Sequence, residues 1–175
     1  MGNTYTVGAG LTLSQAIDDA NADPGSTIEF NLSGTDTYTL SGDLPAISAD
    51  VTIDGTNTTD GNSITIDGGG KYQGFYVSSG TATIEDLTLQ NTAAIGQNGS
   101  AGMDGFTANE DPFPGGGGGG GGAGLGGGLL VGSQASVTLQ NVAFESDSAT
   151  GGNGGEGGTF GGTPSSSKGA GGSGG

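Results

Sequence analysis

Acidic side chains beside predicted strands are the residues of this sequence that could do chemistry. A glycosidase needs two carboxyl groups roughly 5–9.5 Å apart, and neighbouring strands could bring Asp54, Asp67 or Glu85 within that range. However, Asp followed by Gly is ordinary turn chemistry, and Asp54 and Asp67 both precede Gly where a strand is predicted to end. The acidic residues considered are Asp54, Asp67, Glu85, Asp86, Glu145 and Asp147. The turn interpretation is favoured, so no catalytic residue is assigned.

The composition narrows the possible chemistry further. The 175 residues include neither histidine nor cysteine, which removes the commonest general base, thiolate ligands and disulfides. Lys71 and Lys168 are the only basic side chains, whereas a pectate-lyase type of reaction needs a basic group and calcium. The net charge of −16 repels nucleic acid. The sequence therefore predicts a protein that is not an enzyme and has no cofactor and no nucleic-acid partner.

Two weaker ligand patterns are present. Oxygen ligands for calcium are plentiful, but the sequence has no EF-hand loop and no GGxGxDxUx nonapeptide, so no metal site is assigned. Aromatic side chains could line a sugar-binding face, although the strand pattern around Phe75 and Tyr76 favours stacking within the fold. These aromatic residues are Tyr5, Tyr38, Tyr72, Phe75 and Tyr76. No apolar run approaches the ~20 residues of a membrane span, so we expect no direct membrane insertion.

One stretch carries a helical pattern. Leu13, Ala16, Ile17 and Ala20 follow the i, i+3, i+4, i+7 spacing of an amphipathic helix. Thr12 and the glutamine three residues later form a capping-box pattern, and the Pro-Gly pair at 24–25 provides a stop. The sequence predicts one short helix near the N-terminus.

The remaining regular structure is predicted as short β-strands. Runs of β-branched and apolar residues alternate with Gly, Asn, Asp and Ser, as in "VTIDG", "ITIDGGG" and "ATIEDLTLQN". "TIEDLTLQNTAA" at 83–94 aligns with "TLQNVAFESDSA" at 138–149, an offset of 55 residues. Each copy is followed by a glycine-rich stretch. In stacked coils, equivalent loops lie about 4.8 Å apart, so both stretches are expected to leave from one side and run together.

The glycine-rich stretches have a period of three residues. This period matches the polyproline II helix, in which a glycine-only face lets neighbouring extended chains form main-chain hydrogen bonds. A flexible linker is the alternative, but the register favours packed extended helices. The structural glycines are Gly96, Gly99, Gly102 and Gly105 in the first stretch and Gly152, Gly155, Gly158 and Gly161 in the second, continued by Gly169, Gly172 and Gly175. Phe106, Phe113 and Phe160 lie within these stretches and are predicted to pack on the glycine layer or to contact a partner.

The strands and glycines together resemble a known family. The segments "LSQAIDDANADPGSTIEF", "ADVTIDGTN" and "GGGLLV…SVTLQNVAF" look like the N-terminal part of secreted right-handed parallel β-helix proteins, of the autotransporter-passenger and polymorphic-outer-membrane-protein type. The resemblance implies a helical cap over the first coil and a location at the bacterial cell surface. In this sequence the usual cap arginine and the cysteines are absent, and the glycines are expanded.

These observations predict an all-β fold: a right-handed parallel β-helix (solenoid) with a short N-terminal capping helix and lateral polyglycine II segments. Within one structural domain, residues 1–94 form the cap and first coils, 95–128 a glycine-rich insertion, 129–150 a further coil and 151–175 a second glycine-rich segment. The expected function is an extracellular adhesin-like or structural scaffold whose partners are copies of itself, a surface receptor or a glycan. The alternatives are a filament subunit and a carbohydrate-active enzyme.

Overall fold

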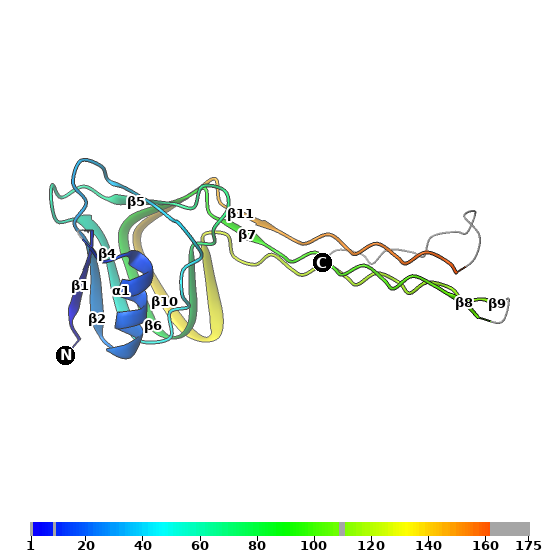
Figure 1. Ribbon diagram of the computed structural model, residues 1–175. Helices are drawn as coiled ribbons and strands as arrows, with labels where there is room; N and C mark the ends of the chain where they lie inside the picture. The colour runs from blue at the N-terminus through cyan, green and yellow to red at the C-terminus, as the bar shows by residue number, and fades with distance from the viewer. Residues whose placement is uncertain (1, 9, 109–110, 162–175) are drawn as a thin grey trace. The chain divides into compact units, whose positions relative to one another are not determined.

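A computed structural model describes residues 2–8, 10–108 and 111–161 of the chain. Gly169, Gly172 and Gly175 lie outside the described residues. The chain forms two compact units. Unit 1 comprises Met1–Ala94 and Gly126–Ser148, and unit 2 comprises Ile95–Leu125 and Ala149–Gly175. The fold is mostly β, with one helix among the described residues and a curled parallel sheet (Figure 1).

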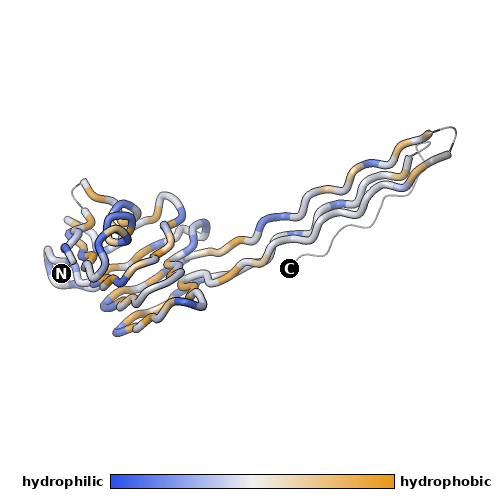
Figure 2. The backbone as a smooth tube through the Cα atoms, turned by 90° about the horizontal axis from the view of Figure 1, so that it is seen from below, coloured by the Kyte–Doolittle hydropathy of each residue, from blue (hydrophilic) through white to orange (hydrophobic). Residues whose placement is uncertain are grey.

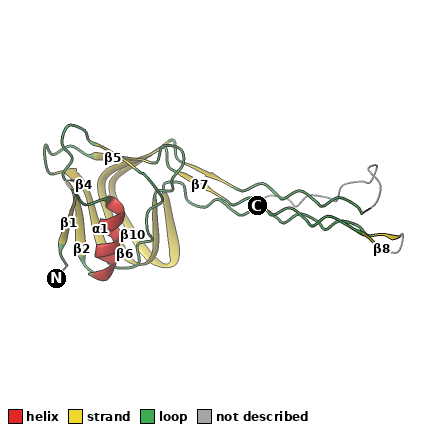
Figure 3. Ribbon diagram, in the orientation of Figure 1, coloured by secondary structure: helices red, strands yellow, loops and turns green. Residues whose placement is uncertain are grey.

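Unit 1 is built on a seven-stranded parallel sheet. Its strands follow the order β1-β2-β4-β6-β5-β3, and β10 pairs with β6 in addition. The long strand β6 pairs with both β4 and β5, so the sheet curls around its interior (Figure 3). The bounds are β1 Thr4–Val7, β2 Ser26–Phe30, β3 Thr37–Thr39, β4 Val51–Asn57, β5 Ile64–Asp67, β6 Phe75–Gln90 and β10 Leu129–Glu145.

The register between β6 and β10 matches the sequence repeat. Thr83 pairs with Thr138 and Leu89 with Phe144, both at the offset of 55 residues. Sequence patterns predicted separate strands at 75–77 and 82–91, and at 129–131 and 136–144, but pairing resumes at Gln134 and Ser79 after a register shift that follows Val131. β6 and β10 are therefore single long strands of 16 and 17 residues.

Apolar side chains at corresponding positions of successive strands form the core of unit 1. Ile53 and Ile84 are register partners and both are 0% exposed, as are Ile66 and Leu89. Branched side chains favour strands, and parallel pairing places like residues directly beside one another. The register therefore accounts for a continuous apolar interior inside the curled sheet.

Helix α1 (Leu13–Ala22) closes the interior at the β1 and β2 end. Its buried residues are Leu13, Ala16, Ile17 and Ala20, the four positions of the predicted apolar face. The predicted capping box is confirmed: the Gln15 N–H donates to the Thr12 hydroxyl oxygen (3.2 Å), and the Gln15 side chain accepts from the Thr12 N–H (3.0 Å). The helix therefore covers apolar residues that would otherwise be exposed beside β1 and β2.

Removing the cap tests its contribution to stability. Thr12→Ala is expected to lower the free energy of unfolding by about 1 kcal/mol, because the first helical N–H groups lose their acceptor. Thr12→Ser retains the hydroxyl and should stay close to the parent protein. Urea unfolding followed by tyrosine fluorescence measures both variants, and equal stability of alanine and serine at this position would contradict the role of the cap.

Sharp corners in the long strands depend on residues with positive φ. Asp86 (53°) and Asn141 (51°) form one such pair within the strands, and Asn91 (51°) and Ser146 (58°) form a second directly after them; the members of each pair are 55 residues apart. Asn and Asp tolerate this left-handed region better than other non-glycine residues. The Asn141 amide donates to the Asp86 carboxylate (2.7 Å), so a side-chain bond ties one corner to the next.

Candidate functional site

Within the residues that the structure describes, unit 2 contains three extended chain segments that run side by side (Figure 2). We call residues 95–108, 113–125 and 149–161 the first, second and third glycine segments. Most of their residues are drawn as loop, without strand or helix (Figure 3). Short strands lie at both ends of the bundle: β7 (Ala93–Ile95) pairs with β11 (Ser148–Thr150), and β8 (Thr107–Ala108) pairs with β9 (Asp111–Pro112).

Main-chain hydrogen bonds close the three glycine segments into a ring. The first segment donates to the third, the third donates to the second, and the second donates back to the first, each through every third residue. The first and third segments are parallel to each other, and the second is antiparallel to both. The end bonds of each set are Gly96 to Thr150 (2.9 Å) and Gly105 to Thr159 (2.6 Å), Gly152 to Gly122 (2.7 Å) and Gly161 to Phe113 (2.8 Å), and Gly122 to Gln97 (2.7 Å) and Phe113 to Phe106 (2.8 Å).

The eight glycines of the predicted three-residue register face the inside of this bundle. A Cβ added at any of them would lie 1.9–2.3 Å from a carbonyl oxygen of another segment. No side chain fits at such a distance, and each of the eight also donates one of the ring hydrogen bonds. They are Gly96, Gly99, Gly102, Gly105, Gly152, Gly155, Gly158 and Gly161.

The second glycine segment was missed by sequence reasoning. The sequence predicted one stretch from 95 to 128, but this stretch doubles back, and the run "FTANEDPFP" lies at the reversal. Its inner glycines are Gly115, Gly118 and Gly121, where an added Cβ would lie 2.0–2.4 Å from a carbonyl oxygen. A period of three cannot be seen inside a run of eight glycines. The proline and acidic interruption was the available signal for the turn.

Two polar side chains fix the register of the first and third segments. Asn98 accepts a hydrogen bond from the Asn153 N–H (2.8 Å), and Asp104 accepts from the N–H (2.8 Å) and hydroxyl (2.9 Å) of Thr159. These bonds satisfy N–H groups that lie outside the main-chain ring. Sequence reasoning did not identify them, although both pairs have the repeat offset of 55 residues.

Phe106 and Phe113 stack on each other at the end of the bundle opposite its three chain connections to unit 1. Their ring centroids are 5.0 Å apart with an interplanar angle of 16°. The rings are nevertheless 63% and 45% exposed. Phe160, the third phenylalanine identified from sequence, is half-buried. The stacked rings therefore form an exposed aromatic surface, whereas Ile95, Met103 and Leu125 are the other large apolar side chains exposed in the described part of the bundle.

The candidate carboxylates serve local structure. Asp67 accepts from the Gly69 N–H (2.8 Å), and Asp147 accepts from the N–H (2.8 Å) and hydroxyl (2.7 Å) of Thr92. Asp54 also accepts locally, from the Thr56 N–H (2.9 Å). Glutamine amides approach the two candidate glutamates, Gln140 at Glu85 (3.3 Å) and Gln90 at Glu145 (3.5 Å).

The register brings only some of these carboxylates together. Asp54 and Glu85 are direct partners, whereas Asp67 pairs with Gln90. The prediction that a strand ends at Asp54 was wrong, because β4 continues to Asn57. The register with β6 ends at Asp54, and the pairing of Asn57 with Phe30 of β2 lies beyond it. Between them, an added Cβ on Gly55 would lie 2.4 Å from the Asp86 carbonyl oxygen.

Asp23, at the end of α1, has a shifted pKa. The Asn3 N–H donates to its carboxylate (2.9 Å) and, as the main cause, lowers the pKa below its ordinary value. Further hydrogen bonds from the side chains of Ser26 and Asn3 act in the same direction. A general acid needs a raised pKa, so this shift keeps Asp23 ionised and unsuited to proton donation.

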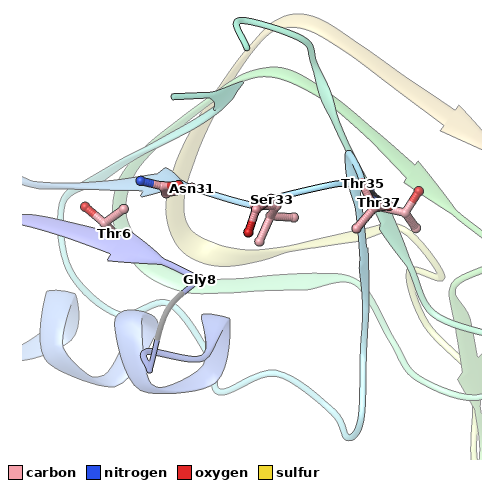
Figure 4. A pocket seen from close by; sticks show the side chains of 7 residues that line it. Thr6, Gly8, Asn31, Ser33, Thr35 and Thr37 are labelled. Carbon is pink, nitrogen blue, oxygen red and sulfur yellow. Dashed lines mark hydrogen bonds between the residues drawn. The ribbon is translucent and has the colours of Figure 1, made fainter. Parts of the chain in front are cut away.

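A hollow of about 510 Å³ lies between β1 and the loop that joins β2 to β3 (Figure 4). Buried Asn57 holds this loop: its amide donates to the Leu32 carbonyl (2.9 Å) and to the Asp36 carboxylate (2.9 Å). The residues that line the hollow carry hydroxyl, amide and aliphatic groups and no carboxylate, so the hollow provides no acid–base pair. They are Thr6, Gly8, Asn31, Leu32, Ser33, Thr35 and Thr37.

The tyrosines and Phe75 considered for sugar binding pack largely on the core. Phe75 is 0% exposed, and Tyr38 contacts Phe30 edge-on at 6.3 Å while its hydroxyl accepts from the Leu13 N–H. Tyr5 and Tyr72 are half-buried against the same core, and Tyr76 is 37% exposed. These residues do not form a common stacking face.

Among the residues that the structure describes, no three His, Cys, Asp or Glu side chains gather as a metal ion would require. Helix α1 has 10 residues, and none of the described helical structure has the length and apolar character of a membrane span.

None of the protein families, curated proteins or solved structures compared with the chain matches it. The interpretation of the site therefore depends on its geometry.

Proposed function

We propose that this chain is a non-enzymatic, extracellular surface protein of adhesin-like or structural type. In this proposal unit 1 is a right-handed parallel β-helix, and unit 2 is a polyglycine II bundle that presents Phe106 and Phe113 to a surface receptor or glycan. The closed ring of main-chain hydrogen bonds is the observation that carries the proposal. It holds three extended segments in one arrangement, with a glycine at every third position facing the inside, which a flexible linker would not need.

The β-helix assignment is supported by the parallel register. Successive passes of the chain, from β2 through β4 and β6 to β10, pair in parallel and place apolar residues at corresponding positions. Stacked coils make a stiff scaffold from short repeats. The net charge of −16 favours solubility and suits an extracellular role.

The polyglycine II assignment is supported by the three-residue period of the ring bonds. At about 3.1 Å per residue, the 13 residues from Gly96 to Ala108 span roughly 40 Å. Over that length the hydrogen-bonded backbone contributes stability without an apolar core. Such a bundle can carry the two phenylalanines at its end in a defined position.

A non-catalytic role is supported by the engagement of the candidate carboxylates. Asp54, Asp67 and Asp147 accept hydrogen bonds from nearby main-chain N–H groups. None of the six candidates lines the hollow of Figure 4. Turnover of an acidic or neutral polysaccharide that is lost on Asp67→Asn or Glu85→Gln would favour the enzyme alternative instead.

Replacing both exposed rings tests the presentation role. The double variant Phe106→Ser/Phe113→Ser is expected to weaken binding to arrayed glycans or whole bacterial cells by about 30-fold or more, as loss of a central aromatic contact does. Leu125→Ser is the matched control, because Leu125 is also exposed (58%) but lies at the other end of the bundle. Amide exchange checks that both variants keep the ring. Equal binding by the double variant and the control would contradict the proposal.

A further inference from the structure

Two outer strands of the sheet in unit 1, β1 and β10, differ in how far other elements cover them. In β10, Val131, Leu139 and Phe144 are 46%, 42% and 45% exposed. Their register partners on β6, which are Val77, Ile84 and Leu89, are all 0% exposed. In the part of the chain that the structure describes, β10 pairs with β6 alone. One edge of β10 therefore exposes both apolar side chains and unpaired backbone groups.

From Gln134 to Gln140, beyond the register shift that follows Val131, this edge lacks the usual protection against pairing. Natural edge strands carry charges, proline or a covering element. Across its 17 residues β10 has no proline and a single charged residue, Glu145. Glu85 of β6 pairs with Asp54 of β4 on one side and with Gln140 of β10 on the other, so the edge strand has an amide where its neighbours have carboxylates. In the same way, Asn141 of β10 lies beside Asp86 of β6. In a chain with a net charge of −16, β10 is thus a long, nearly neutral strand along which two copies can approach with little local repulsion.

The opposite end of the stack offers no equivalent surface. β1 has only four residues, and α1 packs against β1 and β2. Val7 and Ile28 are 0% exposed beneath this cover. A head-to-tail contact needs two different complementary surfaces, whereas a two-fold contact needs one surface that complements itself. The single open edge favours the two-fold contact.

We propose that β10 is a self-association surface, on which a second copy of this chain pairs its own β10 in antiparallel orientation about a two-fold axis. The apolar side chains at the open ends then cover each other, and the edge backbone groups gain partners. Because both open edges are used, the assembly closes as a dimer and does not extend into a filament. This inference does not depend on the presentation role of the phenylalanine pair.

Sedimentation velocity and native mass spectrometry of the whole chain test the dimer. A species of twice the 16.5 kDa chain mass is expected to grow with concentration. Leu139→Lys should weaken dimerisation by about 100-fold or more, because the ammonium group would be buried without a partner. Thr138→Lys is the matched control, with the same added charge on the adjacent residue of the outer face. A monomer at all concentrations, or equal dimerisation by both variants, overturns the proposal, and tyrosine-monitored unfolding checks that both fold.

Cysteine cross-linking tests the orientation, because the chain has no cysteine of its own. Single variants Ala135→Cys, Val137→Cys and Leu139→Cys are oxidised alone and in pairwise mixtures. In an antiparallel pair, the numbers of any two facing residues add up to the same value. A cysteine before the two-fold axis in one copy therefore cross-links to a cysteine after the axis in the other copy. The two-fold arrangement is overturned if the numbers of the cross-linked residues differ by a constant value, if an open-ended series of oligomers grows, or if no position cross-links.

Discussion

Gly118→Ala should unfold the glycine bundle, while Gly116→Ala, two residues earlier in the same run, should leave it intact. A Cβ on Gly118 would lie 2.0 Å from the Gly155 carbonyl oxygen, and backbone atoms cannot yield as a flexible side chain can. A Cβ on Gly116 would lie 3.5 Å from its nearest neighbour, the Met103 nitrogen, which is ordinary contact. Overpacking costs about 1–3 kcal/mol, and each hydrogen bond lost adds about 0.5–1.5 kcal/mol. We expect Gly118→Ala to destabilise the bundle by about 3 kcal/mol or more.

Amide hydrogen exchange measures this effect at the ring donors. Protection of the Gly99 and Gly155 amides should fall by roughly 100-fold in Gly118→Ala, which follows from a loss of about 3 kcal/mol. In Gly116→Ala, the protection of these amides should be unchanged or slightly higher, because alanine restricts the unfolded chain more than glycine does. All four tyrosines lie in unit 1, so their fluorescence should be unaffected in both variants. Similar exchange in the two variants would contradict the packed arrangement.

The elements with a strong local signal could be predicted from the sequence. The helix was marked at its start by Thr12 and Gln15 and at its apolar face by four spaced residues, and both features are present. The 55-residue repeat predicted the pairing partner of β6, because parallel stacking places like residues together. Element boundaries were less predictable. Nothing local indicates that β6 continues from Val77 to Ala82, since that continuity comes from the neighbouring strands.

The arrangement of unit 2 could be predicted only in part. The three-residue register of the first and third segments was visible because side chains interrupt the glycines. The second segment has no such contrast, so its inner face could not be distinguished from its outer face. The stacking of Phe106 on Phe113 depends on the reversal between them, and it was missed together with the reversal. The positive φ of Asp86 and Asn141 was missed as well, since Asp and Asn occur at many other positions with ordinary φ.

Leu89→Ala and Leu139→Ala should differ strongly in cost, although the substitution is the same. Leu89 is 0% exposed and lies in register between Ile66 and Phe144, so its removal leaves a cavity. A buried Leu→Ala change costs about 2–5 kcal/mol. Leu139 is 42% exposed at the open edge, where water fills the vacated space, and its partial burial corresponds to about 1 kcal/mol. Urea unfolding monitored by tyrosine fluorescence measures both variants at low protein concentration.

Repeating this measurement at several protein concentrations distinguishes stability lost within one copy from stability lost through weaker dimerisation. If two copies cover each other along β10, dimerisation stabilises the folded state by mass action, so the stability of the parent protein rises with concentration. Leu139→Ala should then become more costly at high concentration, because it weakens the covered edge as well as the contact with Ile84. Leu89→Ala removes an interior contact that both states share, so its cost should stay nearly constant. A cost of Leu139→Ala that is independent of concentration would locate its whole effect within one copy and would argue against strand pairing between copies.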